Sequence, residues 1–342
     1  MKSIIKYDIA FFLGLLLLFN TYAQDESLKI YQNYDFISGE KIIFEDNFQS
    51  DQDGEFPSHW DLKSGQGVVN KMGDKMAFVI TDGNYAKVKP YMKTENYLSD
   101  SFTVEFDFFS SPNGAGNPIL FFKADGKDTR SINFGYRLNT SNFTSDLSEF
   151  YPEGHEIDFR NKWHHAALAY RGGQMKCYID QYRVLVIPHC GFSPESILLG
   201  GMASKQNPIV LTNVRIALGG NMNMLNKILN EGKFATHAIT FDVNKAVIKP
   251  ESMGFLNQLV KFLQDNPTLK LEVDGHTDSD GDDASNMKLS QARADAVKMQ
   301  LITMGIESVR LIAKGYGETK PISDNSTPDG KANNRRVEFI KL

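Results

Sequence analysis

The sequence has little cysteine, no excess of positive charge and few long apolar runs, and each shortage excludes a class of protein. Two cysteines among 342 residues are too few for a disulfide scaffold or a zinc cluster. Lys and Arg total 37 against 42 Asp and Glu, a net charge of −5, so nothing favours binding to the phosphates of nucleic acid. No second apolar stretch of ~18 residues follows the one near the N-terminus, which excludes a polytopic helical membrane protein.

The residues that are abundant indicate a folded protein with two domains and much β-structure. Hydrophobic residues make up 41% of the chain and charged residues 23%, the balance of an ordinary globular protein. Since a domain averages ~100–200 residues, a chain of 342 is expected to hold two. The 27 glycines, 12 prolines and 24 phenylalanines indicate a turn-rich body.

Residues 1–23 predict a secretory signal peptide. Lys2 and Lys6 precede an apolar run, and Ala23 supplies the small residue before the expected cleavage site. The run is too short for a comfortable membrane span, and an uncleaved anchor is the alternative. No cysteine lies near the cleavage site, so a lipid-modified N-terminus is not expected. We therefore expect the mature protein in an oxidising compartment.

Residues 40–220 show the pattern of many short strands. In the clearest segment, Phe102, Val104, Phe106 and Phe108 alternate with polar residues, which predicts one buried face and one wet face. Turn dipeptides of the Asp-Gly and Gly-Gly kind recur between the segments, and helical periodicity is nearly absent. The pattern predicts an all-β sandwich or a barrel.

One stretch of this region resembles the laminin-G-like or concanavalin-like jelly roll. It runs from Trp163-His164 through the turn at Gly172-Gly173 to Pro188, with Gln181 in place of the usual turn glycine. The resemblance implies a jelly-roll sandwich over residues 40–220. It implies little about a ligand, because such folds include lectins, glycosidases and protein-interaction modules.

The sequence predicts no catalytic residues in this region. Retaining glycosidases of this fold place two glutamates around an aspartate on one strand. The nearest match is Glu156-Ile157-Asp158, which lacks the second glutamate and has Asn161 in its place. We therefore expect a strand whose charged residues face water, and a protein that is not an enzyme.

The two cysteines, Cys177 and Cys190, flank the predicted hairpin. An oxidising compartment would allow a disulfide between them. The sequence leaves open whether the strand geometry lets the two thiols meet. Neither cysteine has the surroundings of an activated nucleophile.

After residue 220 the pattern changes to alternating strands and helices. Residues 221–233 are polar and are expected to form a linker or a short helix, and residues 234–342 are expected to form a compact α/β unit. A strand is expected over Ala238–Phe241, followed by a helix that Pro250 opens. A second strand is expected over Leu271–Gly275.

This unit carries a spaced motif. The motif comprises His276, Asp278, Gly281, Asn286, Leu289, Ser290, Arg293, Ala294, Gly315, Gly317, Asn334, Arg335 and Arg336. It resembles the OmpA C-terminal, peptidoglycan-associated domain, and the match runs from Phe241 to Val337 with every spaced residue in place.

The side chains of the motif suit a zwitterionic ligand. Peptidoglycan stem peptides in most Gram-negative cells carry diaminopimelate, whose side chain ends in an ammonium and a carboxylate on one carbon. Asp278 can pair with the ammonium, and the planar fork of Arg293 can clamp the carboxylate through two hydrogen bonds. The resemblance assigns these same roles to both residues. It adds four more residues to the pocket: Asp242, Asn244, Asn286 and Arg335.

No metal or cofactor is expected. The acidic run from Asp278 to Asp283 lacks the spaced ligands and closing glutamate of an EF-hand. His276 has no other histidine at ligand spacing and is expected to stabilise the loop. Arg336 is expected to be a structural ion-pair partner.

The sequence thus predicts a non-enzymatic protein of the Gram-negative envelope, in the periplasm and associated with the outer membrane and the wall. Its C-terminal unit would bind peptidoglycan through diaminopimelate and tether a jelly-roll domain or the outer membrane to the wall. A glycan or an envelope protein is the expected partner of the jelly roll. Two alternatives remain: an OmpA-type outer-membrane barrel with the same anchor, and a glycan-binding or glycan-hydrolysing jelly-roll protein anchored to the wall.

Overall fold

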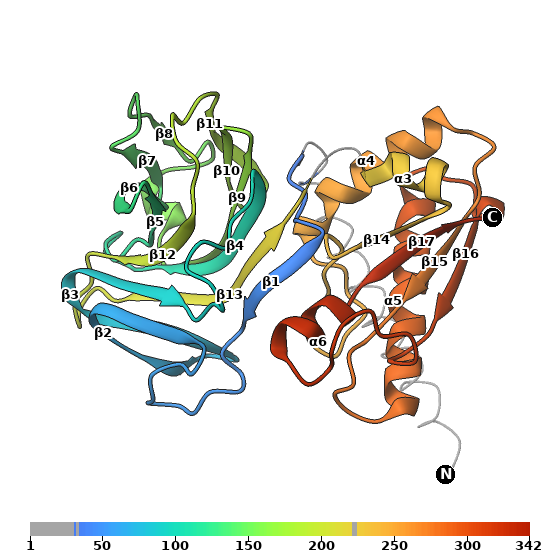
Figure 1. Cartoon of the computed structure of the whole chain (residues 1–342), viewed down its shortest axis with the longest axis horizontal. Coiled ribbons are helices and arrows are strands. Elements are labelled where there is room, and N and C mark those ends of the chain that lie inside the picture. The colour runs from blue at the N-terminus through green and yellow to red at the C-terminus, as the bar shows by residue number, and fades with distance from the viewer. Residues whose placement is uncertain (1–30, 32–33, 221–223) are drawn as a thin grey trace, which may run out of the picture.

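The structure is a computed structural model that describes residues 31, 34–220 and 224–342. The expected signal peptide, residues 1–23, lies outside the described residues. The described chain forms a large β-rich region and a smaller α/β domain, which lie side by side (Figure 1). Among the helices that the structure describes, none has the length and apolar character needed to span a bilayer.

The β-rich region is one curved sheet of 13 strands. Neighbouring strands run antiparallel, and β8 and β11 at the two ends of the strand order approach each other, so the sheet nearly closes. Tyr151 beyond β8 donates a hydrogen bond to Asp180 beyond β10 (3.1 Å), which joins the two ends. The strands are β1 (Lys41–Asp46), β2 (Trp60–Met72), β3 (Lys75–Pro90), β4 (Ser101–Ser110), β5 (Ile119–Ala124), β6 (Lys127–Asn133), β7 (Arg137–Ser141), β8 (Ser148–Phe150), β9 (Lys162–Arg171), β10 (Gln174–Ile179), β11 (Tyr182–Ile187), β12 (Ser196–Gly201) and β13 (Ile209–Leu218).

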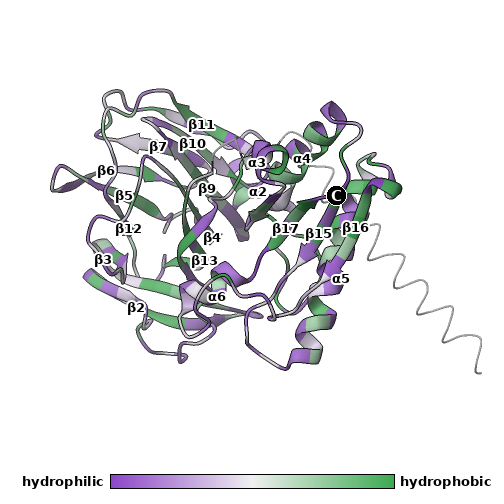
Figure 2. Cartoon of the chain, turned by 45° about the vertical axis from the view of Figure 1, so that its right-hand side comes forward, coloured by the Kyte–Doolittle hydropathy of each residue, from purple (hydrophilic) through white to green (hydrophobic). Residues whose placement is uncertain are grey.

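The expected alternation of β4 is half right. Its four phenylalanine and valine positions lie in the aromatic core, but Thr103, Glu105 and Asp107 on the other face are buried as well. The prediction of a solvent-exposed face is wrong because the segment before β1 covers Thr103 and Glu105, while His165 and Asn213 bond Asp107 (2.9 and 2.7 Å). The Ser38 hydroxyl donates to Glu105, and the Gly39 amide donates to Thr103 (2.9 Å). In the hydropathy colouring, hydrophilic and hydrophobic residues both occur along the strands of this sheet (Figure 2).

Two further expectations for this region are corrected or resolved. Glu156 and Asp158 lie in a short helix, α2 (Glu156–Phe159), and not on a strand; Glu156 is exposed and pairs with Arg160 one turn later (2.6 Å).

The cysteines Cys177 and Cys190 are both buried and free. Burial raises the pKa of the Cys177 thiol well above its usual range, so this thiol is held as a small apolar side chain.

The α/β domain is built on a four-stranded sheet in the order β14-β17-β15-β16, in which β15 and β16 are parallel. Leu256, Leu259 and Leu263 recur along α4 at helical spacing and are buried against the sheet. The elements are α3 (Met224–Glu231), β14 (Lys233–Thr236), the 3-10 turn η1 (Pro250–Ser252), α4 (Met253–Asp265), β15 (Leu271–Gly275), α5 (Asp283–Thr303), the 3-10 turn η2 (Ser308–Arg310), β16 (Leu311–Gly315), α6 (Pro328–Asn334) and β17 (Val337–Lys341).

The first strand of the domain lies earlier than expected. Lys233–Thr236 pairs with β17, whereas residues 238–241 leave the sheet, and Phe241 forms an isolated bridge with Ile248, which belongs to no strand of the sheet. The Thr240 amide instead donates to the Ser252 hydroxyl (3.0 Å). The expected strand over 238–241 is therefore wrong: these residues pack against η1 and the start of α4.

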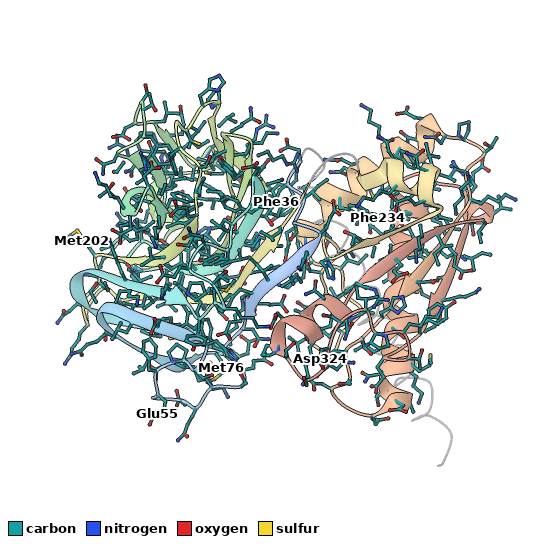
Figure 3. All side chains as sticks on the ribbon, in the orientation of Figure 1. Phe36, Glu55, Met76, Met202, Phe234 and Asp324 are labelled. Carbon is teal, nitrogen blue, oxygen red and sulfur yellow. The ribbon has the colours of Figure 1, made fainter. Side chains whose placement is uncertain are left out.

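The two parts of the molecule pack closely. Asn333 on α6 exchanges two hydrogen bonds with the backbone of Ile42 on β1 (2.8 and 3.1 Å). His237 bonds the carbonyl of Glu40 through Nδ1 (2.8 Å). Phe36 lies at the boundary (Figure 3), and a Cβ on Gly254 would lie 1.8 Å from its carbonyl oxygen.

A buried cluster of charges spans this boundary. His165 on β9 pairs with Asp107 (2.9 Å) and Glu105 (3.7 Å) of β4, and Lys249 pairs with Glu251 of η1 (3.3 Å). Burial alone lowers the pKa of His165, but the hydrogen bond to Asp107 and the charge of Glu251 outweigh it and raise the pKa to about 9. His165 is therefore a cation at neutral pH.

Raising the pH from ~7 to ~9 is expected to lower the free energy of unfolding by about 2 kcal/mol through His165. Its pKa in the folded chain lies above the ~6.5 of an unfolded histidine. Its stabilisation is therefore complete below pH ~6.5 and is lost as the pH rises through about 9. Denaturant unfolding at the two pH values measures the loss. His165→Gln is expected to flatten this dependence, and an unchanged slope in that variant would contradict the assignment.

Candidate functional site

The loop between β15 and α5 is held by close packing at both ends. A Cβ on Gly275 would lie 2.2 Å from the carbonyl oxygen of Ser290, so α5 approaches β15 more closely than any side chain allows. The Ser290 hydroxyl accepts from the Gly317 amide (2.8 Å). Asp282 caps α5 by accepting from the Ser285 amide (3.0 Å). The residues of the loop therefore have one defined placement.

Asp278 is buried in this loop, with 7% of its surface exposed. One carboxylate oxygen pairs with the Arg335 guanidinium, and the other accepts from the Asp280 amide (3.1 Å). Asn286 on α5 donates to the Asp280 carbonyl (3.0 Å) and to the carboxylate of Glu318 (2.6 Å). The structure thus brings three of the expected residues, Asp278, Asn286 and Arg335, into one hydrogen-bonded network. Asn286 fixes the loop that carries Asp278.

Arg293 lies about two turns beyond Asn286 on α5 and is half-buried. Its guanidinium donates to the carbonyls of Lys245 (3.0 Å) and Asp242 (3.5 Å) and lies over the Phe241 ring, 5.0 Å from the centroid. No ion pair joins Arg293 to a carboxylate among residues 34–220 and 224–342. Burial lowers the pKa of Arg293 to about 10, and the charge of Arg335 adds to that effect.

The remaining expected residues, Asp242 and Asn244, lie in the segment that faces Arg293. Asp242 meets Arg293 through its backbone carbonyl, while its carboxylate pairs with Lys245 (3.6 Å). Asn244 sits in an exposed turn with a φ of 55°, a conformation that asparagine tolerates better than most residues. Arg336 pairs with Glu338 (2.5 Å), which confirms its structural role.

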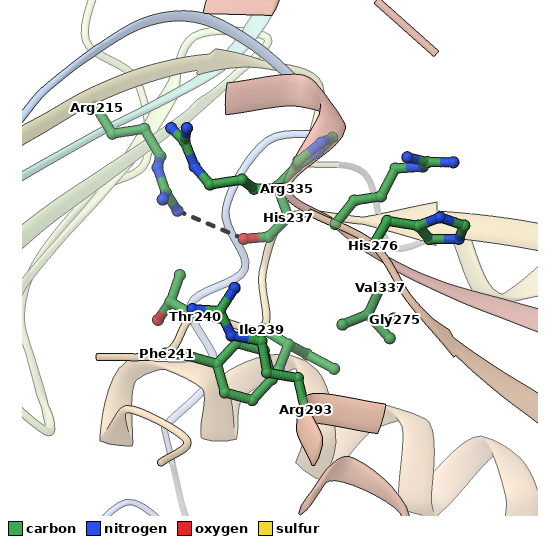
Figure 4. Close-up of a pocket in the computed structure, with 11 residues that line it drawn as sticks. Arg215, His237, Ile239, Thr240, Phe241, Gly275, His276, Arg293, Arg335 and Val337 are labelled. Atoms are coloured by element: carbon green, nitrogen blue, oxygen red, sulfur yellow. Dashed lines mark hydrogen bonds between the residues drawn. The ribbon is translucent and has the colours of Figure 1, made fainter. Parts of the chain in front are cut away.

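A cavity of about 90 Å³ opens beside these residues, and both parts of the molecule line it. Figure 4 shows Arg215, His237 and Arg335 on one side of the cavity and Arg293 with Phe241 on the other. Burial and the charge of Arg336 lower the pKa of His276 in the lining to about 4. Among the arginines of the lining, Arg215, Arg335 and Arg336 pair with carboxylates, whereas Arg293 has no carboxylate partner within the described part of the chain, so this wall favours an anionic group. No cluster of metal-ligating side chains occurs within the described part of the chain.

Two residues of the β-rich region reach this site without having been predicted. Glu45 on β1 pairs with Arg335, and its other carboxylate oxygen accepts from Arg215 Nε on β13 (2.8 Å). Arg215 also donates to the His237 carbonyl (3.4 Å). The one signal in the sequence is that Arg215 is the single charged residue of β13, whereas Glu45 lies next to Asp46 at the end of β1. Nothing local indicates that they face the second domain.

Comparison with known proteins places the similarity in the C-terminal third. A model of the OmpA family matches residues 240–335. Outer membrane porin F of Pseudomonas fluorescens is 50% identical over 100 residues, which are 29% of this chain and 31% of that protein. Outer membrane protein A of Bordetella avium is 41% identical over 99 residues, 29% of this chain and 51% of the other. Peptidoglycan-binding protein ArfA of Mycobacterium bovis is 33% identical over 102 residues, 30% and 31% of the two chains.

The matched segment spans between about a third and about a half of these relatives. The residues that the family model matches do not include the β-rich region. The similarity therefore concerns the domain that carries Asp278 and Arg293, and the function of the whole chain has to be argued from its own residues.

Proposed function

Because residues 240–335 form an OmpA family domain, we propose that this chain is a non-enzymatic cell-envelope protein that binds peptidoglycan non-covalently through diaminopimelate. The observation that carries the proposal is Arg293. It is a half-buried cation in the wall of a cavity, and it has no carboxylate partner within the described part of the chain. Two backbone carbonyls and the Phe241 ring orient this cation but carry no full negative charge, so a ligand carboxylate would still be its first ionic partner.

Each pocket residue has a role in this proposal. Arg293 clamps the carboxylate at the end of the diaminopimelate side chain, because its planar fork matches a carboxylate. Asp278 pairs with the ammonium on the same carbon. Arg335 holds the Asp278 carboxylate in place, and Asn286 fixes the loop through the Asp280 carbonyl. The Mycobacterium bovis relative is named as a peptidoglycan-binding protein, which supports this assignment.

For the β-rich region we propose a jelly roll of the laminin-G or concanavalin type, over residues 40–220, that binds a glycan or an envelope protein. What supports it is the hairpin of β9 and β10, which turns at Gly172-Gly173 where the resembling motif does. With residues 234–342 as the peptidoglycan-binding domain, the chain would tether this region to the wall on the periplasmic side of the outer membrane.

Stem peptides that carry lysine are expected to bind the full chain at least ~10-fold more weakly than those that carry diaminopimelate. Lysine lacks the carboxylate at the end of the side chain. Arg293 would then stay unpaired, and sites built around a polar group discriminate strongly against an analogue that lacks it. Calorimetric titration of both peptides at ~0.15 M salt measures the ratio.

Sedimentation with purified sacculi of the two wall types gives an independent control. Equal binding of both types, fading as salt is added, would show that general charge attraction drives the association. That outcome would remove diaminopimelate recognition from the proposal.

A further inference from the structure

A carboxylate already lies between two arginines at the edge of the pocket. Glu45 accepts from Arg335 with one oxygen and from Arg215 with the other (2.8 Å to Nε). Arg215 and Glu45 are cross-strand partners in β13 and β1, and Arg335 follows α6 in the other domain. We call Arg215 and Arg335 the arginine pair.

The arginine pair has the properties of a carboxylate site. Glu45 and Arg215 are mostly buried, with 17% and 19% of their side chains exposed, so water screens their attraction only partly. Burial raises the pKa of Glu45, but the charges of Arg215 and Arg335 outweigh it and lower the pKa to about 2. Two guanidinium groups at one cavity repel each other, and the anion between them offsets that repulsion.

The same cavity carries a third arginine, Arg293, opposite the arginine pair (Figure 4). The arginine pair has a carboxylate from the chain itself, whereas Arg293 has none among the described residues. A ligand with a carboxylate at each of two ends could pair one carboxylate with Arg293 and the other with the arginine pair. A stem peptide that ends in diaminopimelate is such a ligand, because that residue carries one carboxylate at the end of its side chain and one at its main-chain end.

We infer that Arg215 and Arg335 form a second carboxylate-binding site of the pocket, which Glu45 fills in this structure and which the main-chain carboxylate of a terminal diaminopimelate takes over. The inference rests on the proposed function and extends it to residues outside the family domain. Glu45 belongs to β1, so this exchange also removes an ion pair between the two parts of the molecule. Binding to the wall would thereby loosen their contact.

The test compares two tripeptides ending in diaminopimelate, one with a free main-chain carboxylate and one with that group amidated. Glu45→Ala in the full chain removes the competing carboxylate. It is expected to bind the free acid about 5- to 10-fold more tightly than the wild type does, with the affinity for the amide unchanged. Adding Arg215→Gln to Glu45→Ala is expected to abolish the gain, because one arm of the site is lost. Isothermal calorimetry provides the affinities.

Glu45→Gln is the second variant, because it keeps the shape of the side chain and one hydrogen bond while removing the charge. Thermal unfolding checks that both variants are folded. The inference is overturned if neither variant gains affinity, if the amide gains as much as the acid, or if the gain persists without Arg215. This inference alone is overturned if the wild type binds the tripeptide, the Asp278→Ala variant does not, and the Glu45 variants gain no affinity. Absence of binding by the wild type and by all Glu45 variants overturns the proposed function as well.

Discussion

Arg293→Ala is expected to weaken binding of the full chain to diaminopimelate-type sacculi by roughly 30- to 1000-fold, a loss of about 2–4 kcal/mol. The guanidinium has two backbone carbonyls and the Phe241 ring as its protein partners, so it is oriented before the ligand arrives. Its removal leaves the ligand carboxylate without a cation at that wall. Co-sedimentation with purified sacculi over a range of protein concentrations measures the loss.

Arg293→Lys is expected not to restore this binding. Lysine keeps the charge but loses the two-pronged geometry that matches a carboxylate. Arg293 bonds the Lys245 and Asp242 carbonyls through two different nitrogens, whereas lysine has a single side-chain nitrogen. Lys288→Ala, at an exposed position of the same helix, removes one positive charge and serves as the matched control. The pocket assignment would be wrong if the Asp278→Ala/Arg293→Ala double variant sedimented as well as the wild type.

Gly275→Ala is expected to destabilise the α/β domain by about 3 kcal/mol or more. The added Cβ would lie 2.2 Å from the Ser290 carbonyl oxygen, a backbone atom in the middle of α5. The helix or the strand would have to move, and the loop that carries Asp278 starts at this residue. Thermal unfolding of the full chain measures the loss of stability, and sacculus binding is expected to fall with it.

Gly305→Ala separates this clash from backbone strain. Gly305 has a φ of 98°, but a Cβ there would meet no other atom within 4 Å, so alanine is expected to cost only about 1 kcal/mol. Equal losses at the two glycines would show that α5 yields to the extra methyl group. The close approach of β15 and α5 would then not be what positions the loop.

The sequence by itself determined the local structure that positions the motif. Asp282 caps α5, and Asp278 and Arg293 lie before and along that helix. These features depend on neighbouring residues, because helix caps and helical periodicity are short-range properties. The part of the motif from His276 to Ala294 was legible for the same reason, since its residues follow one loop and one helix. The apolar alternation of β4 likewise placed Phe102 and Phe106 in the core.

Only the tertiary structure decided what covers the second face of β4, which residues form the first strand of the α/β domain, and which carboxylate of the β-rich region pairs with Arg335. The polar face of β4 reads as solvated until Ser38 and Gly39 are placed on it. Lys233–Thr236 becomes a strand because β17, about a hundred residues later in the chain, offers it an edge. Glu45 and Arg335 are 290 positions apart. Their pairing exists because the two parts of the molecule meet at that point, and no local pattern of residues encodes such a contact.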